Sequence, residues 1–361
     1  MSPSGFTAQE LRPAGVRRSV PLKLVAGVTA AAVGGLVALA AALTLLRDEG
    51  GPSPALPDVD SPPTGTLVGA HIRPDDRSEA GQRASIESFE QRLGRRLDID
   101  HNFYRWDKPF PTWRERWTLE QGRIPMISWN GRGVYASDVA AGSHNALIAE
   151  RAVAVKALSG PVLIRWFWEM DGKKKAEWAE SPDDYVAAWR RIRSVFQDEG
   201  ATNARWVWCP NASAFADGDA QAFYPGPEHV EWICGDGYNW APGRPKDRWR
   251  SFSEIFSAFY AWGVRQGKPM MVGEFGVQER EPGEKAAWLR EAREAVKTQF
   301  PSLRALVYFD VDAEHDWRIR TSESAVEAFR ELATDPWFVP LPEALGAGGA
   351  RAATGKVPAD R

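Results

Sequence analysis

Short apolar segments recur between residues 66 and 310, and most of them are separated by segments with a helical pattern of apolar and polar positions. The apolar segments are continuous runs, which is typical of parallel strands that are buried on both faces. Residues 181–200 between two such runs begin with Ser and Pro and end with Gly, as helices commonly do. The apolar runs occupy residues 66–72, 96–103, 123–129, 161–169, 204–211, 231–238, 268–276 and 303–310.

Eight strand–helix units predict an α/β fold, a (β/α)₈ TIM barrel in which a parallel sheet closes on itself beneath a layer of helices. The stretch that carries these units is close to the roughly 250 residues typical of such a barrel. A doubly wound open sheet is the alternative, but no glycine-rich phosphate loop follows the first predicted strand. We therefore expect one barrel domain over residues 65–342.

The N-terminal part of the chain has a different pattern. Residues 24–46 are uninterruptedly apolar, small or weakly polar, and a helix rising about 1.5 Å per residue over this length can cross a bilayer. Basic residues precede the segment, which predicts a cytoplasmic N-terminus and an extracellular domain. A cleaved signal peptide is the alternative, because residues 38–40 resemble a cleavage site. The run is longer than the usual core of a signal peptide, so we favour a single-pass anchor in the cell membrane.

The remaining parts of the chain are expected to lack a packed core. Residues 1–23 form a short cytoplasmic segment in this interpretation, and residues 47–64 are a Pro- and Gly-rich linker between membrane and barrel. Residues 343–361 are rich in Gly and Ala and predict a disordered tail.

Composition narrows the class of ligand. The net charge of −3 gives no reason to expect nucleic acid as a partner. The chain has 17 Trp but only 7 Tyr, and a surplus of Trp favours a groove for flat ligands such as sugars. The five histidines show no metal-binding spacing, so we expect no metal and no cofactor.

Two cysteines are too few for a disulfide scaffold or a zinc module. Cys209 and Cys234 end neighbouring predicted strands, and an exported domain permits a bridge between them. Two buried free thiols are an equally weighted alternative.

Two glutamates stand at the ends of predicted strands, Glu169 after the fourth and Glu274 after the seventh. Active sites of TIM barrels form at these ends, where two carboxyl groups about 5–5.5 Å apart suit a retaining glycosidase. Glu169 stands among aromatic residues, which favours a protonated acid, whereas Glu274 needs donors such as Tyr238 or Arg165 to remain ionised. The alternative for each glutamate is a helix cap or a structural ion pair.

Other residues at or just beyond the strand ends are candidates for substrate binding. Aromatic rings stack on sugar faces and polar groups bind hydroxyls, although core packing is a comparable alternative for each tryptophan. The candidates are His71, His101, Trp129, Asn211, Trp240 and Trp317, together with Arg165, Trp168 and Tyr238. Residues 173–175, three consecutive lysines, are interpreted as a solvated loop, with attraction of an anionic polysaccharide as the alternative.

Several motifs carry a resemblance to a known family. The segments "IRWFWEMDG", "YPGPEHVEWICGDGYNW" and "GKPMMVGEFG" occur in order and resemble glycoside hydrolase family 26 from about Gly65 to Phe338. The resemblance implies a (β/α)₈ barrel with β-mannanase, β-glucanase or β-1,3-xylanase activity. It also implies Glu169 as acid/base and Glu274 as nucleophile, with Tyr238 bonded to the nucleophile and Arg165 four residues before the acid.

The chain departs from the family pattern beside the acid. Trp168 stands where the family has a His, and Asp171 stands where it has an Asn. An indole N–H donates one hydrogen bond and accepts none, so any bond accepted by the His is lost here. A basic loop, with Trp178 as one substitute, replaces an aromatic pair of the family. Both carboxylates are kept, whereas the identity of the sugar is left open.

The sequence therefore predicts a membrane-anchored, extracellular retaining β-glycoside hydrolase, endo-β-mannanase-like, that acts on a β-mannan or β-glucan. Its expected partners are the polysaccharide and the membrane, the latter through residues 24–46. The alternative is a catalytically silent, membrane-tethered module that binds glycans of the cell wall or exopolysaccharide, which Trp168 in place of His favours. A membrane-bound glycosyltransferase is a weaker alternative, because neither an acidic metal motif nor a nucleotide site is present.

Overall fold

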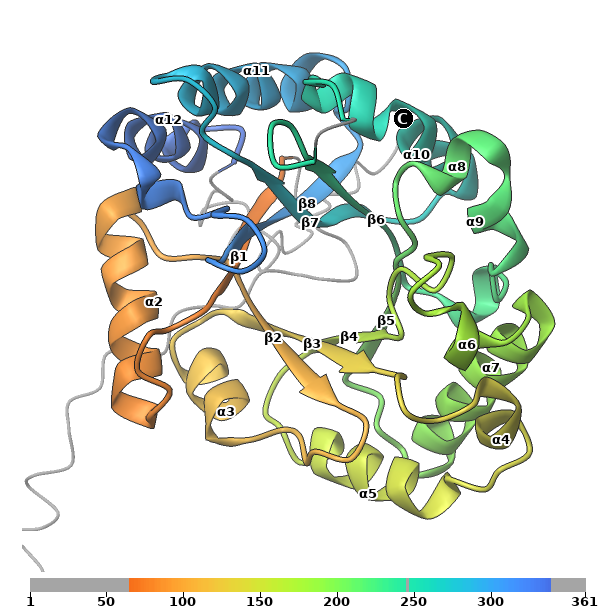
Figure 1. Ribbon diagram of the computed structural model, residues 1–361. Helices are drawn as coiled ribbons and strands as arrows, with labels where there is room; N and C mark the ends of the chain where they lie inside the picture. Colours follow the sequence, from red (N-terminus) through yellow and green to blue (C-terminus); the bar gives the residue numbers. More distant parts are fainter. Residues whose placement is uncertain (1–64, 245–246, 339–361) are drawn as a thin grey trace, which may run out of the picture. The chain divides into compact units, whose positions relative to one another are not determined.

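Eight parallel strands form a closed barrel at the centre of the protein (Figure 1). The structure, a computed structural model, describes residues 65–244 and 247–338. Each strand pairs with the next one in the sequence, and β8 closes the barrel by pairing with β1. The strands are β1 (Leu67–Ile72), β2 (Ile99–Arg105), β3 (Ile124–Asn130), β4 (Val162–Trp166), β5 (Ala204–Trp208), β6 (Trp232–Asn239), β7 (Met270–Val277) and β8 (Leu303–Asp310). The predicted barrel is confirmed.

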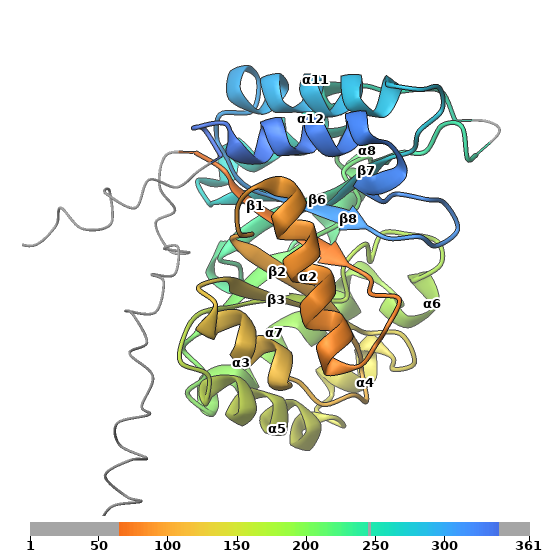
Figure 2. The same ribbon diagram turned by 90° about the vertical axis from the view of Figure 1, so that its left-hand side faces the viewer.

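Helices surround the barrel on its outer side, as two perpendicular views show (Figures 1 and 2). The longer ones follow the strands and form the outer layer, and short helices lie in the loops between them. The α-helices are α2 (Glu79–Leu93), α3 (Trp113–Glu120), α4 (Ala136–Ala140), α5 (Asn145–Lys156), α6 (Ala176–Ala179), α7 (Pro182–Asp198), α8 (Ala214–Asp217), α9 (Asp219–Ala222), α10 (Phe252–Gly263), α11 (Glu284–Thr298) and α12 (Glu323–Thr334). Three 3₁₀ turns complete the set: η1 (Pro227–His229), η2 (Val264–Gln266) and η3 (Ile319–Thr321).

The predicted membrane span at residues 24–46 lies outside the described residues, as do the predicted cytoplasmic segment, the linker and the whole predicted tail. Within the part of the chain that the structure describes, no helix combines the length and the apolar character that a membrane crossing requires.

Local signals explain where the major helices begin. Ser181 caps α7 by accepting a hydrogen bond from the backbone N–H of Asp184, and Pro182 occupies the first turn, where no N–H is needed. This helix matches the one predicted for residues 181–200. Ser251 and Glu254 form a capping box at the start of α10.

The apolar residues form two layers, one inside the barrel and one between barrel and helices. Successive side chains of a strand point to opposite faces, so each strand contributes to both layers. In β3, Met126 belongs to the interior cluster, and Ile127 packs in the outer layer beneath the helices. The interior cluster includes Leu67, Ile99, Ile124, Met126, Leu163, Val207, Trp232, Met271 and Val307. Trp168, in the loop after β4, also belongs to it.

Two predicted strand ends are corrected by the structure. β4 ends at Trp166 instead of Glu169, and β5 ends at Trp208 instead of Asn211. After Trp166 the chain leaves the extended conformation, because Phe167 and Glu169 both adopt positive φ angles of 44° and 52°. The predicted acid therefore lies in the loop beyond β4.

A disulfide joins Cys209, directly after β5, to Cys234 in β6. It lies where the ladder is short, since the register of β5 with β6 contains two residue pairs. Of the two alternatives left open by the sequence, the structure contains the bridge. Cys209, Cys234 and Asp236 are also close enough to bind a metal ion, but the two sulfur atoms are bonded to each other.

The bridge is expected to stabilise the barrel at its β5–β6 seam. Closing a loop of this length contributes about 3 kcal/mol to the free energy of unfolding, by restricting the unfolded chain. We expect a Cys209→Ala/Cys234→Ala variant to lose about that amount in urea-induced unfolding. Non-reducing mass spectrometry serves as the control for the bond. Two alkylatable thiols in the native protein, or an unchanged unfolding midpoint, would contradict the prediction.

Candidate active site

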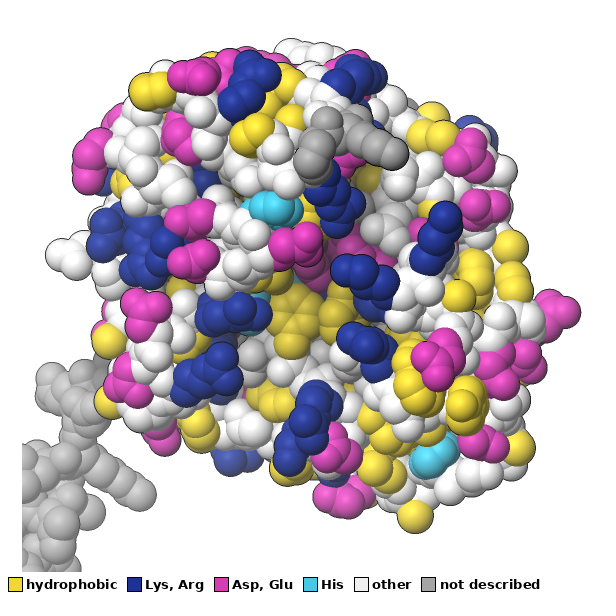
Figure 3. Space-filling model, in the orientation of Figure 1, with side chains coloured by type: hydrophobic (Ala, Val, Ile, Leu, Met, Phe, Trp, Pro, Cys, Tyr) yellow, Lys and Arg dark blue, Asp and Glu magenta, His cyan; other side chains and the backbone are white. Residues whose placement is uncertain are grey.

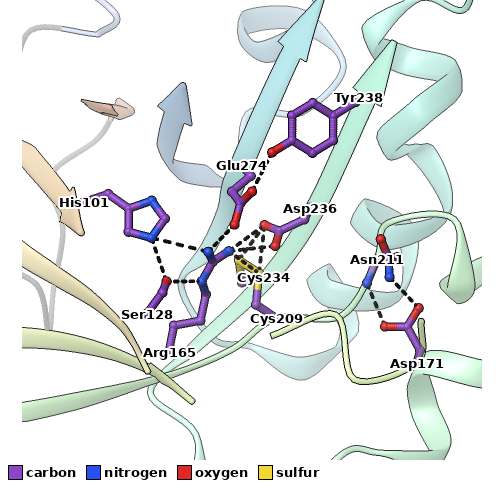
Figure 4. The surroundings of a disulfide bond; sticks show 10 residues. All are labelled: His101, Ser128, Arg165, Asp171, Cys209, Asn211, Cys234, Asp236, Tyr238 and Glu274. Atoms are coloured by element: carbon purple, nitrogen blue, oxygen red, sulfur yellow. Dashed lines mark hydrogen bonds and ion pairs between the residues drawn. A yellow bond between two sulfur atoms is a disulfide. The ribbon is translucent and has the colours of Figure 1, made fainter. Parts of the chain in front are cut away.

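Arg165 of β4 is the centre of a buried polar cluster at the C-terminal end of the barrel (Figure 4). Its side chain is 0% exposed. Nη1 donates to both carboxylate oxygens of Asp236 at 2.9 and 2.7 Å, and Nη2 donates to Glu274. Nε donates to the Ser128 hydroxyl at 2.8 Å. One cation thus holds two carboxyl groups from neighbouring strands.

An irregularity in β7 brings the two carboxyl groups to the same level. The register with β6 passes from Gly235 opposite Val272 to Asp236 opposite Glu274, so Gly273 is the extra residue of a bulge. A Cβ atom on Gly273 would lie 2.9 Å from Asp236 Oδ1 and 3.0 Å from Arg165 Nη1. The residue before Glu274 is a glycine because the Cys234 sulfur and the ion pair both pack against its backbone.

Glu274 accepts hydrogen bonds from Arg165 on one oxygen and from the Tyr238 hydroxyl on the other. Burial raises the pKa of Glu274, the charge of Arg165 opposes this rise, and the nearby charge of Glu169 adds to it. Burial also raises the pKa of Asp236, and this carboxyl is shifted well above its ordinary value. Arg165 donates to both carboxyl groups of this buried pair, and its charge favours the ionised form of each.

The loop after β4 holds Glu169 in a conformation with positive φ. Positive φ in a residue other than glycine costs about 1–2 kcal/mol. Three backbone hydrogen bonds fix this loop: Phe167 N to Trp129 O at 2.9 Å, Glu169 N to Cys209 O at 2.7 Å, and Gly172 N to Glu169 O at 2.9 Å. Strain held by its surroundings is common at functional sites.

The surroundings of Glu169 differ from the apolar collar expected from the sequence. Trp166 and Phe167 point into the layer beneath the helices, where Trp166 stacks on Tyr185 at 5.2 Å. The Glu169 side chain is 28% exposed, and its Oε2 lies 3.3 Å from Nζ of Lys175. The acid therefore stands at the edge of solvent beside a cation.

Lys175 folds back over the same loop. Its Nζ donates to the carbonyl oxygen of Trp168 and lies 4.0 Å from the centre of the Trp168 ring, as in cation–π pairs. Burial lowers the pKa of Lys175. One of the three lysines interpreted as a solvated loop is thus packed into the site.

A cavity of about 420 Å³ opens at this end of the barrel. Glu274 and Trp168 lie on its wall, and the space-filling view shows acidic and apolar side chains at the floor of the hollow (Figure 3). The lining residues are His71, Ile72, Arg73, Pro74, Arg77, Gln82, Asn102, Phe103, Arg114, Trp168, Glu274 and Phe309.

Among the residues predicted to bind substrate, His71 and Trp168 line this cavity. Tyr238 packs against Trp240 at 5.1 Å and against Trp317 at 4.9 Å, so these rings support the nucleophile's donor. Asn211 donates from its backbone N–H and its side chain to Asp171, both at 2.9 Å, and so fixes the loop that carries Glu169.

Three predicted contacts with substrate are corrected. Trp129 is fully buried, because it faces the helices and stacks on Trp106 at 4.4 Å. His101 is fully buried, and its Nε2 contacts the Ser128 hydroxyl at 2.6 Å. Arg165 lies beneath the cavity and holds the carboxylates. His101 and Arg165 act on the site through other side chains.

Asp236, Ser128 and Lys175 belong to the site, although the sequence analysis assigned none of them a catalytic or substrate-binding role. Strand alternation contains the signal for the first two, because Asp236 shares the inward face of β6 with Cys234 and Tyr238, and Ser128 follows Met126 on the inward face of β3. The position of Lys175 depends on the path of a loop, for which the lysine run gives no signal.

An eight-stranded parallel barrel with two glutamates and a cavity at its C-terminal end is typical of glycoside hydrolases. Comparisons with known proteins agree with this class. Residues 139–279 match the model of Glycosyl hydrolase family 26. Endoglucanase H of Acetivibrio thermocellus is 32% identical over 260 residues, which is 69% of this chain and 29% of that protein. The chain thus spans less than a third of the length of this relative.

Solved structures show the same fold. The GH26 β-mannanase BoMan26A from Bacteroides ovatus has a TM-score of 0.58 and 14% identity, covering 76% of this chain and 90% of that one. The Bacillus subtilis mannanase man26 has a TM-score of 0.53 and 19% identity, and the match covers 77% of this chain and 87% of the mannanase chain. The predicted resemblance to glycoside hydrolase family 26 is confirmed, because residues 139–279 match the model of that family.

The pH dependence of stability is expected to report the buried state of His71. Burial lowers the pKa of His71 to about 3, and His71 Nδ1 lies 2.9 Å from the carbonyl oxygen of His101. Because the unfolded chain binds this proton near pH 6.5 and the folded chain does not, stability is lost as pH falls from 6.5 towards 3. In His71→Asn we expect the free energy of unfolding to change less steeply with pH, by up to about 1.4 kcal/mol per pH unit. Identical slopes in urea unfolding between pH 4 and 6 would contradict this expectation.

Proposed function

We propose that the chain is a retaining β-glycoside hydrolase that acts on a β-mannan or β-glucan-type polysaccharide. The observation that carries the proposal is Glu274, held between Arg165 and Tyr238 at the wall of a cavity, with Glu169 on the adjoining loop. A buried carboxylate with two donors is suited to remain ionised and to attack. A half-buried carboxyl beside it is suited to exchange a proton with a leaving group and with water.

In the proposed reaction, a carboxylate oxygen of Glu274 attacks the anomeric carbon and displaces the glycosidic oxygen. Glu169 gives its proton to that oxygen as the bond breaks. Glu169 then takes a proton from water, whose oxygen attacks the anomeric carbon and releases Glu274. Arg165 and Tyr238 hold the nucleophile in place throughout both steps.

The cavity favours a sugar chain as substrate. Phe103, Trp168 and Phe309 give it apolar faces, and His71 and Asn102 add polar groups for hydroxyls. The similar proteins named above, one endoglucanase and two mannanases, support a β-linked glucan or mannan.

We further propose that the domain works outside the cell, tethered by residues 24–46. The apolar segment with its preceding basic residues supports this location. The Cys209–Cys234 disulfide supports it too, because such bonds persist mainly in oxidising compartments.

The two glutamates are tested by conservative substitution. We expect Glu169→Gln and Glu274→Gln each to lower hydrolysis of the best β-glycan substrate by about 10²–10⁴-fold or more, because each removes a proton donor or a nucleophile. Glu177→Gln, at an exposed position of α6 in the same region, is the matched control and should keep full activity. Wild-type rates in either site variant would refute the assignment, and binding without any product would favour a silent glycan-binding module.

The stereochemistry of the product tests the mechanism separately. A double displacement returns the β configuration, so the first product formed from soluble β-mannan or β-glucan should be the β anomer. Proton NMR during the first minutes of reaction distinguishes it from the α anomer. An α product would show a single displacement by water and would remove Glu274 from the role of nucleophile.

A further inference from the structure

Two arginines line the cavity of the candidate site without a carboxylate partner. Arg73 and Arg77 lie in the loop between β1 and α2, both are exposed, and both face the cavity that Glu274 and Trp168 line. Within residues 65–244 and 247–338, no ion pair of either guanidinium group is found. Arg73 Nη1 donates at 3.3 Å to the backbone carbonyl of Asp312.

The acids of the same loop are engaged elsewhere. Asp75 lies 3.6 Å from Arg320. Asp76 accepts hydrogen bonds at 2.8 Å from both the backbone N–H and the hydroxyl of Ser78, the residue that caps α2. Neither carboxylate forms an ion pair with Arg73 or Arg77, so both guanidinium groups are available to an anion in the cavity.

More cations stand near the cavity. Lys175 lies on the Trp168 ring with its side chain 12% exposed, and Lys173 and Lys174 are exposed on the same loop. The space-filling view shows basic side chains at several points around the hollow (Figure 3). The whole chain carries a formal charge of −3, so the positive charge here is a local feature.

We propose that the glycan bound here is anionic, and that Arg73 and Arg77 bind a carboxylate or sulfate group on a sugar unit next to the cleaved bond. A neutral glucan or mannan offers no charge to these two guanidinium groups, whereas an anionic sugar can pair with them. Guanidinium groups bind planar carboxylates and sulfate-like oxyanions through paired N–H donors. This inference rests on the proposed function, whose β-glycan it specifies as an acidic one.

Binding by a hydrolysis-impaired protein tests the charge preference. The probes are neutral cellohexaose, the same oligosaccharide oxidised to carboxylates at C6, and its C6-sulfated form, each titrated into Glu169→Gln by calorimetry. We expect an anionic form to bind about tenfold more tightly than the neutral one at low salt, and this advantage to shrink towards 0.5 M NaCl. The carboxylated and sulfated forms distinguish the two kinds of anion.

The role of the arginines is tested by Arg73→Gln/Arg77→Gln in the same background. This change should weaken binding of the preferred anionic form by about tenfold and leave cellohexaose binding within about twofold. Retained cellohexaose binding also shows that the variant is folded. Arg265→Gln/Arg304→Gln removes two arginines of η2 and β8 near the N-terminal end of the barrel, and should leave both affinities unchanged.

Two outcomes would overturn the proposal: equal binding of neutral and anionic forms by the parent protein, or an anionic preference that survives loss of both arginines. These outcomes differ from failure of the proposed function. A wild-type protein that prefers the anionic forms but cleaves none of the three would refute the hydrolase and keep the anionic ligand. A protein that cleaves cellohexaose but binds neutral and anionic forms equally would keep the hydrolase and refute the anionic ligand.

Discussion

The mouth of the barrel depends on one buried positive charge, the guanidinium group of Arg165. It faces two carboxyl groups, Asp236 and Glu274, where water is excluded, so the cluster carries an excess of negative charge when both are ionised. Burial raises the pKa of both carboxyls, and the charge of Arg165 opposes that rise at each of them. Removing one partner of such a pair leaves an unpaired buried charge, which typically costs about 3–5 kcal/mol.

Neighbouring features follow from this charge. His101 lies beside the guanidinium group, and burial together with Arg165 holds the pKa of His101 well below its ordinary value. The neutral ring accepts at Nε2, near Ser128 and Arg165, while its Nδ1 has no hydrogen-bond partner among the described residues. The bulge at Gly273 and the Cys209–Cys234 bridge set the backbone around Asp236. The interior of the barrel therefore holds both an apolar cluster and, at its C-terminal end, the buried polar cluster around Arg165.

The sequence predicted the barrel and both glutamates because continuous apolar runs mark buried parallel strands, whose ends converge. Strand alternation would also have placed Trp129 outward and Arg165 inward, since Met126 and Leu163 on the same strands face the interior. Two features had no such signal. The end of β4 depends on positive φ angles at residues that are not glycine, and the burial of Lys175 depends on contacts with Trp168 across the loop.

The same loop links the acid to the charge of the cavity. Trp168 fills the place of the family's histidine and presents a ring face, which Lys175 covers while it also contacts Glu169. Lys175 lies 3.3 Å from Glu169 and Arg165 donates to Glu274, so each glutamate of the site has a cation beside it. Arg73 and Arg77 then add two positive charges on the cavity wall. Cations beside both glutamates and on the cavity wall can accept an anionic sugar that the two glutamates alone would repel.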